Sequence, residues 1–171
     1  MDRTPPRTTA LRLASALVFL LGCGAKTSYE GGLYRDATTS FYVDAPGAEY
    51  ERVDGIGASG LSWAGPGDAM LQVKARCDRS LDIPLRALLG HLLIGFTEQE
   101  TIREELLPMD GREALERHLL AKIDGVPREL VLRVLKKDGC VYDFALVASP
   151  GENFTRALPG YTRMVESFET R

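Results

Sequence analysis

The chain from Phe41 onward alternates between apolar and polar residues, which is typical of strands that are buried on one face. The alternating segments are 69–77, 117–123, 130–134 and 142–148. Asp-Gly pairs at 110–111, 124–125 and 138–139 separate the later segments at equal intervals, and such pairs favour tight hairpin turns. The sequence therefore predicts an antiparallel meander of long strands.

The segment 85–96 changes to the helical period. Its apolar positions form one stripe at a spacing of three and four residues: Leu85, Leu88, Leu89, Leu92, Leu93 and Phe96. Pro84 suits the first turn of a helix, and we expect Asp82 or Ser80 to cap it.

A second, shorter helix is predicted near the C-terminus, where Tyr161, Met164, Val165 and Phe168 share one face. Pro159-Gly160 is expected to start or kink this helix. Two amphipathic helices need an apolar surface to cover. The predicted fold class is therefore α+β, a largely antiparallel sheet covered by helices.

The first residues resemble a bacterial lipoprotein signal. Arg3, Arg7 and Arg12 make a basic start, and the apolar stretch 13–21 follows. A helix of this length spans about 14 Å, which is too short to cross a bilayer but suits a signal peptide. Leu20-Leu21-Gly22-Cys23 then resembles the lipobox, although Leu21 is a less usual occupant of its position.

This resemblance implies cleavage after Gly22 and lipidation of the Cys23 Sγ atom, so the membrane would be a partner through the acylated cysteine. The alternative is a secretory or uncleaved leader that contains a cysteine by chance. We expect a signal peptide over 1–22, a lipidated N-terminus and flexible tether over 23–39, and a single α+β domain over 40–171. Gly24 favours the outer membrane, because aspartate in that position retains enteric lipoproteins at the inner membrane.

Composition narrows the class of protein. The 171 residues are 44% hydrophobic with a net charge of −3, which fits one globular domain. There is no basic field to hold nucleic acid. Loss of 1–22 would remove more basic than acidic residues, so attachment to a membrane would depend on acyl chains rather than on a polybasic patch.

Cys77 and Cys140 would remain as an even pair in an oxidising compartment. The alternation places each at the end of a strand's apolar face. They form a disulfide if their strands are neighbours or end at the same rim, and they are two buried thiols if the strands lie further apart.

Three features with possible chemistry are interpreted as structural. The motif Gly55-x-Gly57-x-x-Gly60 precedes Trp63 and a Gly-Pro-Gly run rather than a helix, so we expect a loop and no nucleotide cofactor. His91 and His118 lack metal-ligand or nucleophile spacing, and we expect solvated or packed histidines and no metal. An acidic run is interpreted as a solvated face: Glu98, Glu100, Glu104 and Glu105.

The order of four segments resembles the PsbP-like family of α/β/α sandwiches, which includes the Ran-binding factor Mog and small bacterial envelope lipoproteins. The segments that carry the resemblance are Phe41 to Pro46, Met109 to Ala114, Cys140 to Phe144, and Met164 to Phe168. It covers residues 40–170. The resemblance implies a non-enzymatic accessory or docking module, and no binding residue is carried over.

We therefore expect a lipid-anchored accessory or docking protein of the bacterial cell envelope that has envelope proteins as partners and no catalytic activity. The alternative is a periplasmic carrier of a small ligand or lipid, which would need a cavity between helix and sheet. A hydrolase is a third hypothesis and would need a pocket that joins His91 or His118 with an acid and a nucleophile.

Overall fold

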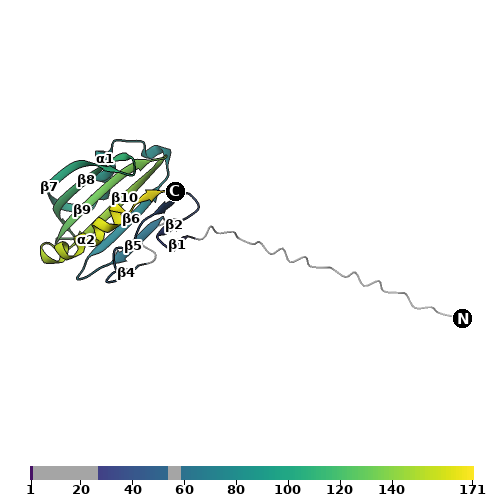
Figure 1. Ribbon diagram of the computed structural model, residues 1–171, viewed down its shortest axis with the longest axis horizontal. Coiled ribbons are helices and arrows are strands. Elements are labelled where there is room, and N and C mark those ends of the chain that lie inside the picture. The colour runs from purple at the N-terminus through teal and green to yellow at the C-terminus, as the bar shows by residue number, and fades with distance from the viewer. Residues whose placement is uncertain (2–26, 54–58) are drawn as a thin grey trace.

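The computed structural model describes Met1, residues 27–53 and residues 59–171. Within this part of the chain, the larger sheet has seven antiparallel strands in the order β4-β5-β6-β10-β9-β8-β7 (Figure 1). These strands are β4 (Glu51–Arg52), β5 (Gly60–Ala64), β6 (Met70–Arg76), β7 (Phe96–Met109), β8 (Arg112–Ile123), β9 (Val126–Lys137) and β10 (Cys140–Ala148).

The predicted meander is confirmed, because β7, β8, β9 and β10 pair in chain order. Asp110, Asp124 and Asp138 have φ angles of 49°, 50° and 53°, and each is followed by a glycine with positive φ. Two successive residues with positive φ match the right-handed twist of a hairpin, which explains why Asp-Gly pairs occur at all three turns.

A smaller four-stranded sheet has the order β1-β2-β3-β11. Its strands are β1 (Ser28–Glu30), β2 (Leu33–Arg35), β3 (Ser40–Tyr42) and β11 (Glu169–Thr170). The expectation of a flexible tether over 23–39 is therefore wrong for residues 28–35, which form a hairpin. Tyr34 holds the hairpin to the domain, because its ring is fully buried and stacks on Phe41 at 4.6 Å between centroids.

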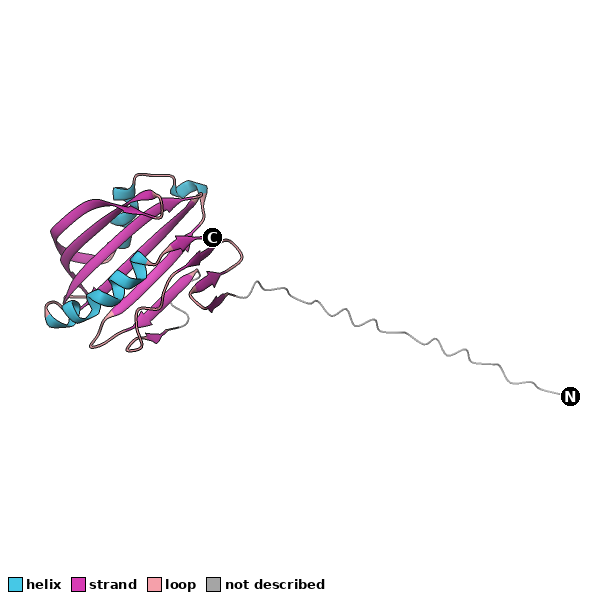
Figure 2. Cartoon of the chain, viewed as in Figure 1, coloured by secondary structure: helices cyan, strands magenta, loops and turns pink. Residues whose placement is uncertain are grey.

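Two α-helices cover opposite faces of the larger sheet (Figure 2). Helix α1 (Leu85–Leu92) packs on β8 and β9, whereas α2 (Glu152–Glu166) packs on β10 from the other side. A 3₁₀ helix, η1 (Arg79–Leu81), precedes α1. The arrangement is an α/β/α sandwich, and the predicted fold class is confirmed. No helix in the described residues is both long and apolar enough to span a membrane.

The predicted bounds of α1 need correction. The helix ends at Leu92 rather than Phe96, because Gly95 has a φ of 92° and Phe96 already begins β7. Pro84 is the N-cap residue, and neither Asp82 nor Ser80 caps the helix. Asp82 instead accepts a hydrogen bond from Lys136 Nζ at 2.6 Å.

Helix α2 is longer than predicted. It begins at Glu152, seven residues before Pro159, which was expected to start or kink it, and contains Pro159 in its interior. The missed first turns carry Phe154 and Ala157, which are buried against the sheet. Phe168 lies beyond the helix, at the centre of an aromatic cluster with Phe41, Tyr142 and Phe144.

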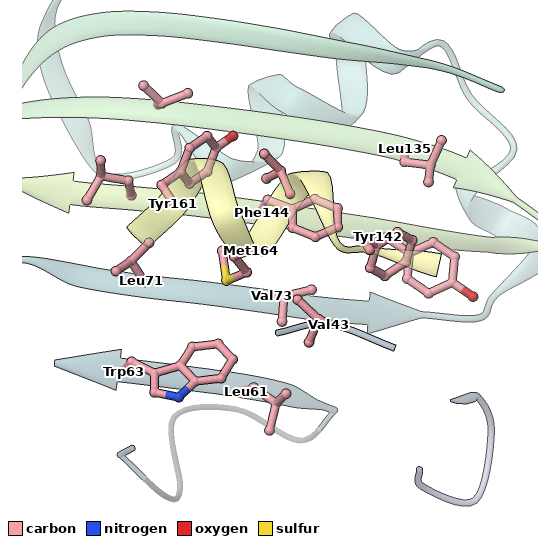
Figure 3. Packing of buried hydrophobic residues seen from close by; sticks show 14 of the residues in the cluster. Val43, Leu61, Trp63, Leu71, Val73, Leu135, Tyr142, Phe144, Tyr161 and Met164 are labelled. Carbon is pink, nitrogen blue, oxygen red and sulfur yellow. The ribbon is translucent and has the colours of Figure 1, made fainter. Parts of the chain in front are cut away.

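The sheet separates two hydrophobic clusters. Tyr161 and Met164 of α2 pack over Leu71 and Phe144 on one face (Figure 3). On the other face, Leu88 and Leu89 of α1 and its C-cap residue Leu93 pack against a second group of strand residues, which are Leu115, Leu119, Leu130, Leu132 and Val134. The strands are therefore apolar on both sides where both helices overlap them.

Candidate functional site

A groove of about 440 Å³ lies between α2 and the sheet formed by β7, β8 and β9. Its apolar lining includes Leu107, Val131, Phe154, Leu158 and Val165. Its charged and polar lining includes Arg103, Glu116, His118, Arg133, Tyr161, Thr162 and Glu166. This mixture of apolar surface and converging polar side chains makes the groove the candidate functional site.

Glu116 is the central charge of the groove and is only 5% exposed. Arg133, its register partner on β9, donates from Nε to Glu116 Oε2 at 2.8 Å and lies at 2.6 Å through Nη2. Arg103 Nη2 donates to Oε1 at 3.3 Å from β7. Glu116 is thus a buried carboxylate that two guanidinium groups neutralise.

Tyr161 of α2 is the third partner of Glu116 in this cluster. Its hydroxyl donates to Glu116 Oε2 at 3.2 Å and links α2 to the sheet. Burial, and then the negative charge of Glu116, raise the pKa of Tyr161 well above its ordinary value. The phenol therefore stays protonated and acts as a fixed hydrogen-bond donor. The three partners of Glu116 hold the floor of the groove in one arrangement.

His118 is packed at the end of the groove nearest the start of α2. Its ring stacks on Phe154 with 5.0 Å between centroids, and its Nε2 lies 2.9 Å from Glu129 Oε1. The second oxygen of Glu129 accepts a hydrogen bond from Gly151 N at 3.0 Å, immediately before α2. His118 therefore positions the helix.

His91 lies elsewhere, on the exposed side of α1, so the two histidines are not brought together. No group of three or more His, Cys, Asp or Glu side chains in the described residues is arranged to hold a metal ion. The structure places neither histidine beside a nucleophile in the groove lining, whose hydroxyl groups are those of Tyr161 and Thr162.

The structure joins Cys77 and Cys140 by a disulfide, so the pairing that the sequence left open is confirmed. β6 and β10 are neighbours in the sheet, and Arg76 pairs with Val141, which places the two cysteines opposite one another. Cys140 is buried as expected, but Cys77 is exposed because it follows the last residue of β6. Cys23 lies outside the described residues.

The acidic run lies on β7, the edge strand of the larger sheet. Glu98 and Glu100 are exposed, as expected for a solvated face. Glu104 differs, because Arg117 Nε donates to it at 2.6 Å and Arg86 of α1 pairs with it. Glu104 therefore links α1 to the edge strand of the sheet through an ion pair.

The glycine motif lies mostly outside the described residues, which resume at Ser59. Gly60 is the first residue of β5, so a strand follows the motif instead of the helix that a dinucleotide site needs.

The Glu116 cluster is the part of the site that the sequence analysis missed. A local signal existed for Arg133, whose neighbours two residues away are Val131 and Leu135, and a weaker one for Glu116, whose corresponding neighbours are Ala114 and His118. A charged residue on the buried face of each of two successive strands indicates a buried ion pair. The third partner, Tyr161, carries no such signal because aromatic residues fill cores anyway.

Comparisons with known proteins identify the architecture. A cyanobacterial PsbP, CyanoP from Synechocystis, matches with a TM-score of 0.54 and 14% identity over 88% of this chain and 95% of that chain. The fold is PsbP-like. LpqN, which is involved in cell envelope biogenesis of Mycobacterium tuberculosis, matches with a TM-score of 0.52 and 14% identity, covering 85% of this chain and 89% of its own. No protein-family model and no curated protein sequence matches the chain.

The segments that carry the resemblance seen in the sequence contact one another in the structure. Ser167 of the C-terminal segment accepts a hydrogen bond from Asp44 N at 2.8 Å, and Asp44 belongs to the first segment that resembles the family. Asp110 of the second segment accepts from Thr170 N at 2.9 Å. Segments far apart in the chain therefore meet around the small sheet and hold the C-terminus in place.

Proposed function

We propose that this protein is a lipid-anchored accessory protein of the bacterial cell envelope, and that it docks a partner protein in the groove under α2 without catalysing a reaction. The observation that carries the proposal is the position of this groove relative to the point where the chain leaves the domain. The groove adjoins β7, the edge strand at the opposite side of the larger sheet from β5, beside which β1 lies.

The anchor would hold the domain close to the membrane. With β1 beginning at Ser28, only residues 24–27 separate Cys23 from the folded domain. Four residues can span at most about 14 Å in any conformation. A lipid on Cys23 would therefore keep the hairpin β1–β2 near the headgroups, rather than letting the domain diffuse on a long tether.

The same geometry would turn the groove away from the membrane. Tyr29 of β1 packs edge-on against Trp63 of β5 at 6.0 Å between centroids, so the hairpin lies beside the β4–β5 side of the sheet. Five strand spacings separate β5 from β7 in the sheet order, which corresponds to about 24 Å. β7 and β1 lie at opposite ends of the domain in Figure 1.

The polar groups of the groove favour docking over catalysis. Glu116 is engaged by Arg103, Arg133 and Tyr161, and His118 is engaged by Glu129. A general base needs a lone pair that can reach a substrate proton. Groups that satisfy one another build a rigid surface instead, and the apolar residues between them offer area for a partner to bury.

The similarity to LpqN supports the cellular setting, since that protein is involved in cell envelope biogenesis. The lipobox-like segment Leu20 to Cys23 supports it independently, because it lies outside the region that determines the fold.

Fatty-acid labelling in cells tests the anchor. The wild-type chain should incorporate the label and fractionate with membranes, and Cys23→Ala should do neither because its thioether sulfur is absent. Label that persists on Cys23→Ala would refute lipidation at this residue.

Site-specific photo-crosslinking in the same cells tests the groove. A photoreactive residue at Thr162, which is exposed and lines the groove, should give one discrete protein adduct. Arg163 is the matched control, because it is exposed on the same helix but does not line the groove. Equal adducts from both positions, or none from Thr162, would contradict docking at this surface.

A further inference from the structure

The face of the sheet opposite the groove is only partly covered. Helix α1 has eight residues and is about 12 Å long, whereas β8 and β9 have twelve residues each and extend for about 40 Å. The helix packs on β8 and β9. A cavity of about 210 Å³ lies beside it, above β9, β10 and β6.

The lining of this cavity has an apolar part and a polar part. The apolar lining is formed by Leu92, Phe96, Leu130, Leu132, Ala145 and Val147. The polar lining lies on β6 and β10 and consists of Gln72, Lys74 and Asp143. Lys74 and Asp143 are register partners, so an ammonium group and a carboxylate stand side by side at one wall.

Asp143 is the unusual member of this wall, because its side chain is only 6% exposed. Arg76 Nε donates to Asp143 Oδ2 at 2.7 Å, whereas Asp143 Oδ1 and Arg76 Nη2 are both buried and neither has a hydrogen-bond partner among the described residues. Burial raises the pKa of this carboxyl group, and Arg76 opposes the shift. Buried polar atoms in folded proteins are nearly always satisfied, and a hydroxyl or amide group beside this ion pair could donate to Oδ1 and accept from Nη2.

We propose that this cavity binds a small neutral molecule of single-ring size that carries a hydroxyl or amide group. The polar group donates a hydrogen bond to Asp143 Oδ1, and the ring occupies the apolar part between α1 and the sheet. This ligand site lies on the other face of the sheet from the docking groove and is independent of the proposed docking function.

Size and charge both select this class. An apolar cavity of about 150 Å³ holds benzene, so 210 Å³ has room for a ring with one or two substituents. A cation is disfavoured because Arg76 already neutralises Asp143 and Lys74 adds a positive charge. A hydrocarbon fits by size but leaves Oδ1 without a donor.

The test compares p-cresol with toluene, which has the same ring and methyl group but no donor. The protein is purified in detergent micelles in the form that the cells produce, and the methyl NMR signals of Leu132 and Val147 are followed during titration. We expect saturable shifts with p-cresol and at least tenfold weaker binding of toluene. Both probes also partition into the micelles. This partition is the same for every variant under the same conditions, so a comparison of two variants with the wild type removes it.

Asp143→Ala removes the acceptor and should abolish the preference for p-cresol. Ala145→Leu leaves Asp143 in place, fills the cavity from the half-buried wall position, and should abolish binding of both probes. If Asp143→Ala does not fold, Ala145→Leu and the comparison of the two probes decide the question. Three outcomes would each overturn the proposal. They are equal affinities for p-cresol and toluene, a preference for p-cresol that persists in Asp143→Ala, and no shift with either probe because the cavity holds only water.

Discussion

Cys77 lies directly opposite Cys140 across the antiparallel pair β6 and β10, and the two sulfur atoms are bonded. The bond joins residues that are 63 positions apart in the sequence. The closed loop includes α1, β7, β8 and β9, which are three of the seven strands of the larger sheet and one of its two covering helices. The disulfide therefore restricts the unfolded chain over a little less than half of the domain.

Reduction of this disulfide should lower the free energy of unfolding. Chain entropy gives about 4 kcal/mol for a loop of this length, and measured values are typically about 2–4 kcal/mol. Denaturation with and without reductant measures the loss, and Cys77→Ala should show the same loss without reductant. Alkylation without prior reduction provides the check, because two alkylated cysteines at 77 and 140 in the native protein would mean that the bond is absent.

Glu116→Gln should destabilise the domain by about 3–5 kcal/mol, because it leaves the Arg133 guanidinium buried without its counter-charge. Glu105→Gln is the matched control on the neighbouring strand, where the side chain is 35% exposed and pairs with Arg103. It should cost less than about 1 kcal/mol. Urea denaturation measures both, and similar losses for the two variants would show that Glu116 is not the central charge.

Leu89→Ala should cost about 2–5 kcal/mol, since Leu89 is fully buried between α1 and the sheet and its loss leaves a cavity. His91→Ala changes an exposed residue of the same helix and should alter stability by less than about 0.5 kcal/mol. Thermal denaturation of the two variants checks this. A large effect of His91→Ala would assign that histidine a role that packing does not explain.

Asp110→Asn should lower stability at neutral pH and have a smaller effect in acid. Burial alone would raise the pKa of Asp110, but hydrogen bonds from Lys137 and Thr170 outweigh burial and lower it. A carboxyl group with a lowered pKa in the folded state contributes stability above its ordinary pKa and loses that contribution as the pH falls. We expect a loss of about 1–2 kcal/mol at pH 7 that shrinks below about pH 4.

Asn is well suited to this test because it tolerates the positive φ of 49° at position 110. Asp124→Asn changes an exposed residue at the same position of the next hairpin and should have little effect at any pH. A loss at Asp110 that stays constant from pH 3 to pH 7 would mean that its charge contributes nothing.

Much of the fold was predictable because it depends on local patterns. Alternation places residues such as Phe144 and Leu146 on one buried face without reference to other strands, and Asp-Gly turns set the register of the hairpins that they close. The stripe of α1 follows from the same local geometry. Local patterns also predicted the two cysteines at strand ends, but whether they pair depends on strand order, which they do not specify.

The tertiary structure alone decided which distant residues meet. The hairpin at 28–35 resembles a linker in composition and is held against β5 by Tyr29, which packs edge-on against Trp63, a residue 34 positions later in the sequence. Arg103 and Tyr161 reach Glu116 from an edge strand and from a helix on the covering layer. Asp143 faces a cavity because α1 is too short to cover the sheet. The sequence determines periodicity and turns, which act between near neighbours, whereas these sites depend on how whole layers are placed.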